Sequence, residues 1–479
     1  MKIDLIKRYK EKPLQAKAAF WYMVCFVLQK GILALTTPLF ARLMTTEQYG
    51  QFTVYMSWSN ILIILATLKL NDSVFNVGMS KFANQRDEVV STFQILTIAL
   101  TSALIIFYAV FRDQIQKLIG LADSIILFMI FETYANSAIY FWDKRKYYEY
   151  QYKPVVLKTV SMTCLNTLLG LVLVFYMNEK GYGRILSCLL VNGLFGLVIL
   201  ISNLKRGHFT FRPEFAKFAL RFNLPLMGHY LSMYILEQFD RIMIQKIAGF
   251  SPAALYGLAY HIGTILTILT ASIINTITPW MYNKLKQKDY TNIGNIFLKL
   301  CFLLCSFSAC IAAFAPELIL LFGGKEYLDA QYVISPIALC MIFRFLYMLY
   351  ANIEFFFEKN KAAMFMSGFA AVLDVILNYF GIKLFGYIAA AYTTLICYAV
   401  LFALHYTYAM KCFPAGDCEK PDFKIKNTVA ILVGTIPVHL SFTLLFSNHI
   451  IRYFMILLCL AIISMFRNKF KDVISLVRK

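Results

Sequence analysis

The sequence has few charged residues and few of the motifs that enzymes carry. Asp, Glu, Lys and Arg make up 15% of its 479 residues, where soluble domains contain about 25%. The six histidines form no cluster, and neither a P-loop nor a dinucleotide-binding motif is present. The sequence therefore predicts a protein that is not an enzyme and needs neither a cofactor nor a metal. It also argues against ATP-driven transport by this chain alone.

Acidic residues and disulfide-forming cysteine patterns are scarce as well. The chain has 26 acidic against 46 basic residues. The basic residues are scattered over short loops, without a basic helix, zinc motif or RNA-binding signature, which argues against a nucleic-acid partner. Most of the eleven cysteines fall in apolar segments, where free Cys behaves as a small buried hydrophobe. Cys412 and Cys418 share a loop, but their spacing matches no metal-binding pattern.

Long apolar runs are what the sequence has in abundance. Hydrophobic residues make up 60% of the chain, and the mean hydropathy is +0.64. Because about 20 apolar residues span the hydrocarbon core, we predict an all-α polytopic membrane protein with about 14 transmembrane helices. The predicted spans are residues 18–41, 52–70, 90–111, 123–142, 155–177, 184–203, 222–247, 253–277, 293–315, 330–352, 362–380, 386–410, 427–446 and 449–466.

The charge of the loops tests this number of spans. If the N-terminus is cytoplasmic, about 32 basic residues lie inside and about 9 outside, as the positive-inside rule requires. The alternation never reverses along the chain. No small-residue cleavage site follows the basic N-terminal segment, so we expect the first span to be retained. Both termini are therefore predicted to be cytoplasmic.

A weak internal repeat accompanies the spans. TTEQYG at residues 45–50 follows the first span, and PAALYG at residues 252–257 follows the seventh. Six spans separate the two copies, so both halves enter the membrane in the same orientation, an arrangement that some transporters use to place a site between two bundles. We predict an N-terminal bundle at residues 1–210, a second bundle at 211–412, and a helix pair with a cytoplasmic tail at 413–479.

Several blocks resemble polysaccharide-biosynthesis membrane proteins, the Wzx-like flippases. They are PLFARLMTTEQYG at residues 38–50, FNLPLM at 222–227, QFDR at 238–241, YGLAY at 256–260, and APELI with FGGKEY at 315–327. The resemblance covers nearly the whole chain in order. It places the chain with the multidrug/oligosaccharidyl-lipid/polysaccharide exporter superfamily.

That resemblance implies both a fold and a function. The fold is two six-helix bundles facing each other across a V-shaped cavity, with two additional C-terminal helices. The function is transport of a sugar repeat unit on undecaprenyl pyrophosphate across the bacterial cytoplasmic membrane, for O-antigen, capsule or exopolysaccharide assembly. The partners are then this lipid-linked oligosaccharide, membrane lipids, and a polysaccharide polymerase with a chain-length regulator.

Five basic residues lie inside predicted spans, where each costs about 2.5–3.5 kcal/mol on insertion scales. Lys30 and Arg344 are central in their spans, so we interpret them as lining a cavity that binds an anion. The alternative is a side chain that snorkels to the interface. Snorkelling or contact with lipid headgroups is our interpretation for the three that lie close to span ends, Lys158, Lys299 and Arg452. Arg241, in the outer part of span seven, joins Lys30 and Arg344 as a predicted cavity residue.

Acidic residues in the spans are interpreted as gating or ion-pair groups. They are Glu132, Glu237, Asp240 and Asp374. Asp240 and Arg241 are adjacent and point about 100° apart on a helix, so we expect them to have separate partners. Lys30 and Glu237 each lie nineteen residues before a repeat tyrosine, which predicts that they meet across the cavity in one conformation. Inter-helix salt bridges are the alternative. A fifth acid, Glu354, is expected in a solvated position at the cytoplasmic end of its span.

Two other functions remain open. A cation-coupled multidrug antiporter shares the fold, but Lys30 and Arg344 would repel a cationic drug. A membrane polysaccharide polymerase needs catalytic groups on a sizeable outer loop, and the predicted outer loops are short and nearly free of histidine.

Overall fold

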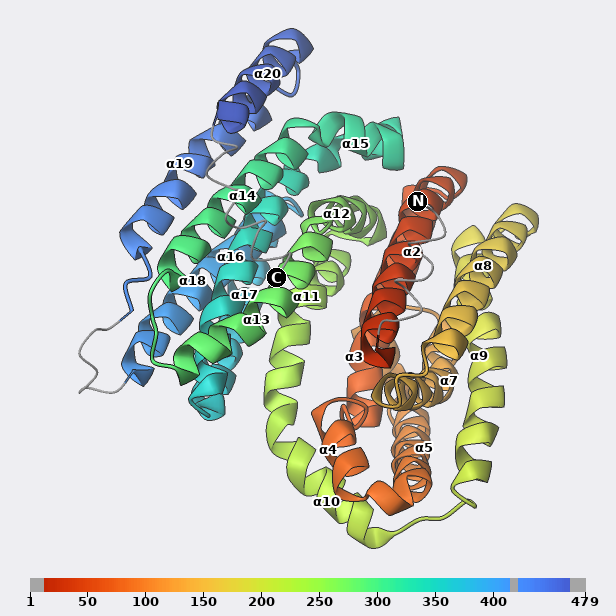
Figure 1. Cartoon of the computed structure of the whole chain (residues 1–479). Helices are drawn as coiled ribbons and strands as arrows, with labels where there is room; N and C mark the ends of the chain where they lie inside the picture. The colour runs from red at the N-terminus through yellow and green to blue at the C-terminus, as the bar shows by residue number, and fades with distance from the viewer. Residues whose placement is uncertain (1–12, 414–420, 466–479) are drawn as a thin grey trace, which may run out of the picture. The chain divides into compact units, whose positions relative to one another are not determined.

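The structure is a computed structural model that describes residues 13–413 and 421–465, and over these ranges it contains helices and no strand. Every apolar segment predicted to span is helical, which confirms the all-α prediction. In chain order these helices are α2 (Leu14–Leu43), α3 (Thr46–Thr67), α5 (Arg86–Val110), α7 (Asp123–Tyr148), α8 (Tyr152–Tyr176), α9 (Lys180–Arg206), α11 (Met227–Ala248), α12 (Phe250–Gly263) with α13 (Leu266–Lys286), α14 (Ile293–Ala313), α16 (Gln331–Phe356), α17 (Asn360–Phe385), α18 (Ala389–Cys412), α19 (Ile425–Leu444) and α20 (His449–Met465) (Figure 1).

The number of spans is lower by the strict measure of length and apolar composition. Within the described residues, nine helices are long and apolar enough to cross a membrane, and ten if α12 and α13, bent by 42°, form one span. Of the fourteen predicted spans, the four that do not meet this measure are α2, α3, α11 and α20. Charged residues explain why α11 does not meet this measure, because it carries Glu237, Asp240, Arg241 and Lys246. Fourteen spans therefore stays a prediction.

Short helices connect the long ones, and the sequence did not predict them as separate elements. They are α4 (Ser73–Lys81), η1 (Ala83–Gln85), α6 (Arg112–Ile119), α10 (Pro213–Asn223), η2 (Leu224–Leu226), α15 (Ala315–Phe322) and η3 (Lys325–Ala330). The start of α3 shows a local cause of helix formation: Thr45 and Gln48 each accept a hydrogen bond from the other's backbone N–H, which satisfies two donors that the helix leaves free.

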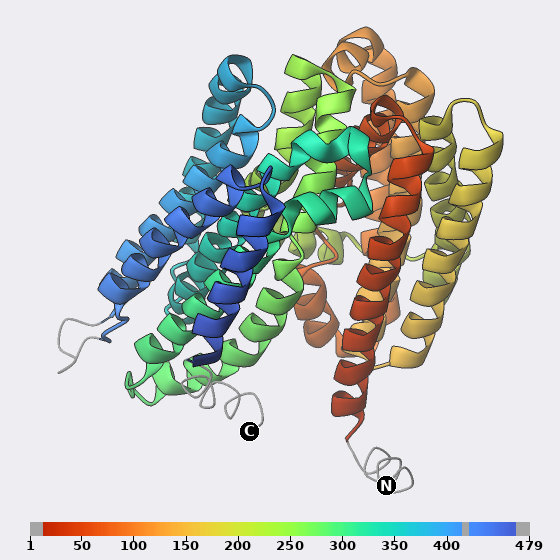
Figure 2. The same cartoon turned by 90° about the horizontal axis from the view of Figure 1, so that it is seen from above.

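The chain divides into two compact units, unit 1 (Met1–Tyr234) and unit 2 (Ile235–Lys479). Both have a short helix between the third and fourth long helices, α6 in unit 1 and α15 in unit 2. The packing also corresponds: α5 on α7, α7 on α9 and α8 on α9 in unit 1, and α14 on α16, α16 on α18 and α17 on α18 in unit 2. Figures 1 and 2 show α8 beside α9. This order supports the internal repeat.

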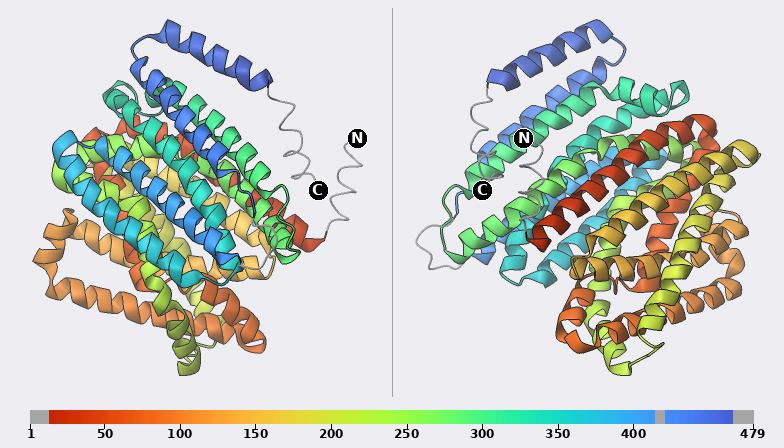
Figure 3. Two further views of the ribbon diagram at one scale, coloured as in Figure 1. Left: turned by 90° about the vertical axis from the view of Figure 1, so that its left-hand side faces the viewer. Right: turned by 45° about the vertical axis from the view of Figure 1, so that its right-hand side comes forward.

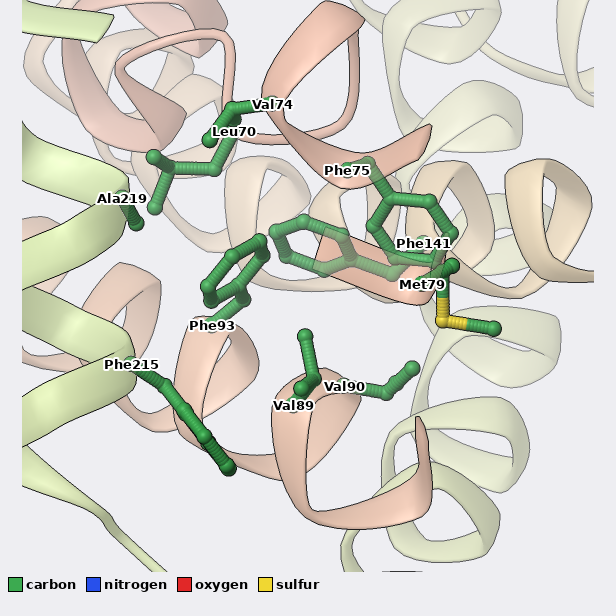
Figure 4. Close-up of a cluster of buried hydrophobic side chains, with 10 residues drawn as sticks. All are labelled: Leu70, Val74, Phe75, Met79, Val89, Val90, Phe93, Phe141, Phe215 and Ala219. Atoms are coloured by element: carbon green, nitrogen blue, oxygen red, sulfur yellow. The ribbon is translucent and has the colours of Figure 1, made fainter. Parts of the chain in front are cut away.

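The boundary between the units lies within α11, whereas the repeat predicted a division at 210/211. Packing explains the difference, because α10 lies on α4 and α5 and so belongs to unit 1. Phe215 and Ala219 of α10 enter a buried cluster, shown in Figure 4. Its other members are Leu70, Val74, Phe75, Met79, Val89, Val90, Phe93 and Phe141. Fully burying a side chain such as Phe215 stabilises by about 1.5–3 kcal/mol.

The last two helices attach to unit 2 along α14. Both views of Figure 3 place α19 beside α14. A buried imidazole helps to hold them: His439 of α19 is 3.0 Å from Ser308 of α14 and 2.9 Å from Ser335 of α16. Both ring nitrogens thus have hydroxyl partners, as a buried polar group requires.

Candidate functional site

The central charge of α16 is paired. Arg344 forms an ion pair with Glu237 of α11, and each side chain remains 25% exposed. An arginine in a membrane helix is tolerated when a partner offsets its desolvation, and Glu237 is that partner here. Because the pair is not fully buried, both groups remain accessible to an exchange of partners.

A second arginine lies on the same side of unit 2. Arg241 donates to the Glu237 carbonyl at 2.7 Å and to Gln238 Oε1 at 3.3 Å, and its guanidinium lies 4.1 Å from the centre of the Tyr260 ring. It is only 3% exposed, and within the described residues no carboxylate lies at ion-pair distance from it. Arg344 therefore binds the carboxylate of Glu237 and Arg241 binds its backbone carbonyl, so two guanidinium groups lie beside this residue.

Two buried carboxylates lie deeper in the same unit. Asp240 of α11 accepts hydrogen bonds from Tyr256, from Thr394 at 3.1 Å and from Asn378 Nδ2 at 2.8 Å. The same Asn378 nitrogen donates to Asp374 at 3.0 Å, and both aspartates are fully buried. As helix geometry predicts, Asp240 and its neighbour Arg241 have separate partners. One amide thus joins two carboxylates.

The charges of these groups do not balance if all of them ionise. Glu237, Asp240 and Asp374 bring three negative charges, and Arg241 with Arg344 brings two positive ones. Two carboxylates that share a buried site cannot both ionise without a further positive charge. The Asp240–Asp374 pair is therefore suited to hold one proton or one monovalent cation. The described residues contain no group of three or more His, Cys, Asp or Glu side chains that could hold a metal ion.

The buried carboxylate of unit 1 has different partners. Glu132 of α7 accepts hydrogen bonds from Tyr55, from Asn192 at 2.5 Å and from Asn136 at 3.3 Å. In the described part of the chain no basic side chain pairs with it, so neutral donors alone stabilise it.

Lys30 lies in α2, and its side chain is outside the part of the chain that the structure describes. Its position in a cavity and its pairing with Glu237 stay predictions. Glu237 has another partner in unit 2, Arg344.

Three residues assigned to interfaces or solvent are in fact paired inside the protein. Arg452 is fully buried and pairs with Glu317 of α15, and Lys158 pairs with Asp143 at 2.6 Å. Glu354 is fully buried against His405 of α18. Distance from a span end indicates depth in the membrane but not which neighbouring helix a side chain faces, so these three assignments were wrong. The assignment of Lys299 to an interface stays a prediction.

Sequence reasoning also missed Arg184. It is 9% exposed and donates to Asn166 at 2.5 Å and Ser187 at 2.7 Å. Its guanidinium lies 4.4 Å and 5.0 Å from the ring centres of Phe40 and Phe52. It was overlooked because it opens a predicted span. Ser187, one turn later on the same helix face, is the signal that was available.

Comparison with known proteins decides the family. The sequence model of the polysaccharide biosynthesis protein family matches residues 16–284, more than half of the chain. The chain belongs to the polysaccharide biosynthesis protein family. A second model, that of the MatE family, matches residues 225–380. The resemblance to polysaccharide-biosynthesis membrane proteins seen in the sequence motifs is thereby confirmed.

The chain is similar to sequence relatives and to several solved structures. A Haemophilus influenzae protein named for the Lsg locus is 23% identical over 348 residues, which covers 71% of this chain and 84% of the relative. Lipid II flippase MurJ in an inward closed conformation has a TM-score of 0.65 at 14% identity, covering 94% of this chain and 99% of that one. An inward-facing multidrug transporter of the MATE family has a TM-score of 0.59 at 16% identity, covering 81% and 94%.

Proposed function

We propose that this protein flips oligosaccharide repeat units linked to undecaprenyl pyrophosphate across the bacterial cytoplasmic membrane, by alternating access, for surface polysaccharide assembly. The observation that carries the proposal is the ion pair of Arg344 with Glu237, beside which Arg241 donates to the Glu237 backbone carbonyl and, among the described residues, has no carboxylate at ion-pair distance. A pyrophosphate is the anion that such a site favours. MurJ, by its name a flippase of lipid II, supports the proposal through its fold.

The Arg344–Glu237 pair suggests how the substrate binds. The planar guanidinium forms two parallel hydrogen bonds with phosphate oxygens as well as with a carboxylate. An arriving pyrophosphate replaces Glu237 on Arg344, so the arginine never loses its counter-charge. Lys30, proposed to lie in the same cavity, adds a second contact, and the polyprenyl tail stays in the lipid.

Asp240 and Asp374 are proposed to gate the transition between conformations. Their pair gains or loses one positive charge, and such a change biases the helices that it joins, α11 and α17 directly and α18 through Thr394. A ligand shifts a conformational equilibrium only through different affinities for the two states. Glu132 is proposed to stabilise unit 1 within this cycle.

Topology and partners belong to the same proposal. Both termini are cytoplasmic, and a polysaccharide polymerase with a chain-length regulator receives the flipped lipid. A reporter fused after Lys479 should read as cytoplasmic, and one inserted near Lys325 as external. An external C-terminus would overturn the fourteen-span topology.

Binding of the purified protein to lipid-linked oligosaccharide tests the function. Arg344→Ala and Lys30→Ala should each weaken binding by roughly tenfold or more, since a hydrogen bond to a charged group contributes about 1.5–3 kcal/mol. Lys299→Ala is the control and should bind normally. Unchanged affinity in both variants would remove these two residues as the phosphate-binding groups.

Deletion in cells separates the alternatives. Loss of the protein should leave the lipid-linked units on the cytoplasmic leaflet and remove the mature surface glycan, with little change in sensitivity to cationic drugs. Intact glycan with increased drug accumulation would indicate a multidrug antiporter instead.

A further inference from the structure

Unit 2 contains a second buried acid–base pair that substrate binding does not use. His405 Nδ1 of α18 lies 3.0 Å from both carboxylate oxygens of Glu354 of α16. The two side chains are 1% and 0% exposed. A histidine hydrogen-bonded to a carboxylate is a common carrier of protons, because either ring nitrogen can bind or release one.

One face of α18 connects this pair with the buried aspartates. Thr394 donates to Asp240, Tyr398 follows one turn later, and His405 lies about three turns, or about 16 Å, beyond Thr394. The gap is filled by Tyr347 of α16, whose ring centre is 6.0 Å from that of Tyr398 and 5.4 Å from that of His405. A continuous row of ionisable or hydroxyl-bearing side chains thus runs between the two sites.

Three buried polar atoms along this row have no hydrogen-bond partner among the described residues. They are Asp374 Oδ1, Tyr398 Oη and His405 Nε2. Buried polar groups in native proteins are nearly always satisfied, and ordered water is the usual partner where the protein supplies none. The row therefore has sites for water at both ends and in the middle.

We propose that Glu354 and His405 carry protons between the end of unit 2 predicted to be cytoplasmic and the Asp240–Asp374 pair. This rests on the gating role proposed for the aspartates. Glu358, one turn beyond Glu354, is exposed, so the end of the row at Glu354 lies close to the protein surface. Relay over such a distance needs groups in hydrogen-bond contact directly or through one water, and we place one water at each of the three atoms of the row that lack a partner among the described residues.

The relay moves protons only. Glu354, after taking up a proton, gives it to Nδ1 of His405, and the resulting imidazolium releases its other proton from Nε2 toward Tyr347, Tyr398 and Asp374. The aspartate pair takes up that proton and so neutralises the one unbalanced negative charge of the site. No electron moves, and only O–H and N–H bonds form and break.

Other charged and titratable groups face both ends of the row. Tyr347 lies beside His405, and Cys412 of α18 lies near Glu354. Around the aspartates lie Arg241 from α11, Tyr256 from α12, Cys340 from α16 and Cys397 from α18. Tyr398 of α18 lies near Arg344, Glu237 and Tyr260. The arginines stay charged, so they favour the ionised pair and make the bound proton releasable.

Proton uptake by the purified full-length protein tests the proposal without any lipid-linked substrate. After a rapid drop in pH, a pH-sensitive dye should record an uptake phase that disappears in the double variant Asp240→Asn with Asp374→Asn. His405→Gln should keep the amplitude of that phase but slow it by at least roughly tenfold, as for the loss of a general acid–base group. Glu354→Gln serves as a second variant if His405→Gln does not fold.

His439→Gln is the matched control, because His439 is also a buried imidazole of unit 2 but lies between Ser308 and Ser335. It should leave the rate and amplitude unchanged. Equal rates in His405→Gln, Glu354→Gln and wild type would overturn the pathway, as would an uptake phase that survives the double aspartate substitution. Because no substrate is present, failure to bind lipid-linked sugar would overturn the proposed function and leave this result standing.

Discussion

Unit 1 and unit 2 repeat one order of helices but hold their ion pairs in different places. In unit 1 the described ion pairs join mainly one end of the bundle, where Arg145 binds Asp87 and Glu149, and Arg212 binds Glu88. In unit 2 two of them lie along the length of α16, at Arg344 and Glu354. One helix of unit 2 thus carries charge through its interior.

The difference indicates a division of roles. Charges at helix ends stabilise connections, including the attachment of α10 to unit 1, at little desolvation cost. Charges in the interior are costly and are retained where a site needs them. Among the predicted site residues, the buried acid of unit 1 is Glu132, and neutral side chains donate hydrogen bonds to its carboxylate. In unit 2, by contrast, the amide of Asn378 donates to two carboxylates, those of Asp240 and Asp374. We therefore expect substitutions of buried acids to affect stability in unit 1 and transport in unit 2.

The largest expected effect is on transport by Asp240→Asn. Losing a member of a buried charged network costs about 3 kcal/mol, or about 100-fold in a rate. Glu132→Gln is the counterpart in unit 1: its new amide opposes the donors Asn136 and Asn192, so it should lower the melting temperature, while transport per folded molecule changes little. Flipping in proteoliposomes and thermal unfolding measure the two effects. Equal loss of transport in both variants would remove the division between the units.

Much of the fold was accessible from the sequence because its physical cause is local. Apolar runs and loop charge located every long helix, since length and polarity decide membrane insertion. The break between α12 and α13 was not foreseen. Gly263 ends α12, and a Cβ there would lie 2.6 Å from Ile337 of α16, a contact between segments far apart in the sequence. The boundary between the units inside α11 was not predicted either, because it depends on which helices α10 packs against.

Only part of the candidate site could be predicted from the sequence. Mid-span position singled out Arg344 and Glu237 as costly charges, but they are 107 residues apart, and nothing in the local pattern pairs them. Asn378 and His405 were overlooked because amide and imidazole side chains in a span carry no obligatory charge, so they give a weak signal. Their importance follows only from the carboxylates they contact, Asp240 and Glu354.

The next largest effect concerns how closely the helices of unit 1 pack. A Cβ at Gly196 of α9 would lie 2.3 Å from the Ala135 Cβ and 2.4 Å from its Cα on α7. Gly196→Ala should therefore destabilise by about 2 kcal/mol through overpacking. Gly193 of the same helix has nothing within 4 Å, so Gly193→Ala should raise stability slightly through its helix propensity. Thermal unfolding of both variants checks the prediction, and equal melting temperatures would contradict the close contact.

A smaller effect is expected for the ion pairs at the end of unit 1. Arg145→Ala removes the contacts with Asp87 and Glu149 and should cost about 1 kcal/mol, because Asp87 remains partly exposed and its interaction is screened. Arg112→Ala breaks an exposed pair with Asp123 and should have a smaller effect still. Unfolding at low and high salt measures both. A loss of transport per folded molecule in Arg145→Ala would show that the charges at this end do more than stabilise.

The smallest effect is expected for Asp289, in the turn between α13 and α14 of unit 2. Lys284 and Thr291 lower the pKa of Asp289 to about 2 from its ordinary value of 3.8. A depressed pKa means that the contribution of Asp289 is fully present above the ordinary value and is lost only as the pH falls toward about 2. The difference in melting temperature between wild type and Asp289→Asn should therefore be small and constant between about pH 5 and about pH 8. Any pH dependence of transport over that range should be identical in the two proteins if it arises, as proposed, from the buried groups on α11, α16, α17 and α18. A pH profile of transport that shifts in Asp289→Asn would mean that a surface acid, rather than the interior of unit 2, sets the protonation that transport requires.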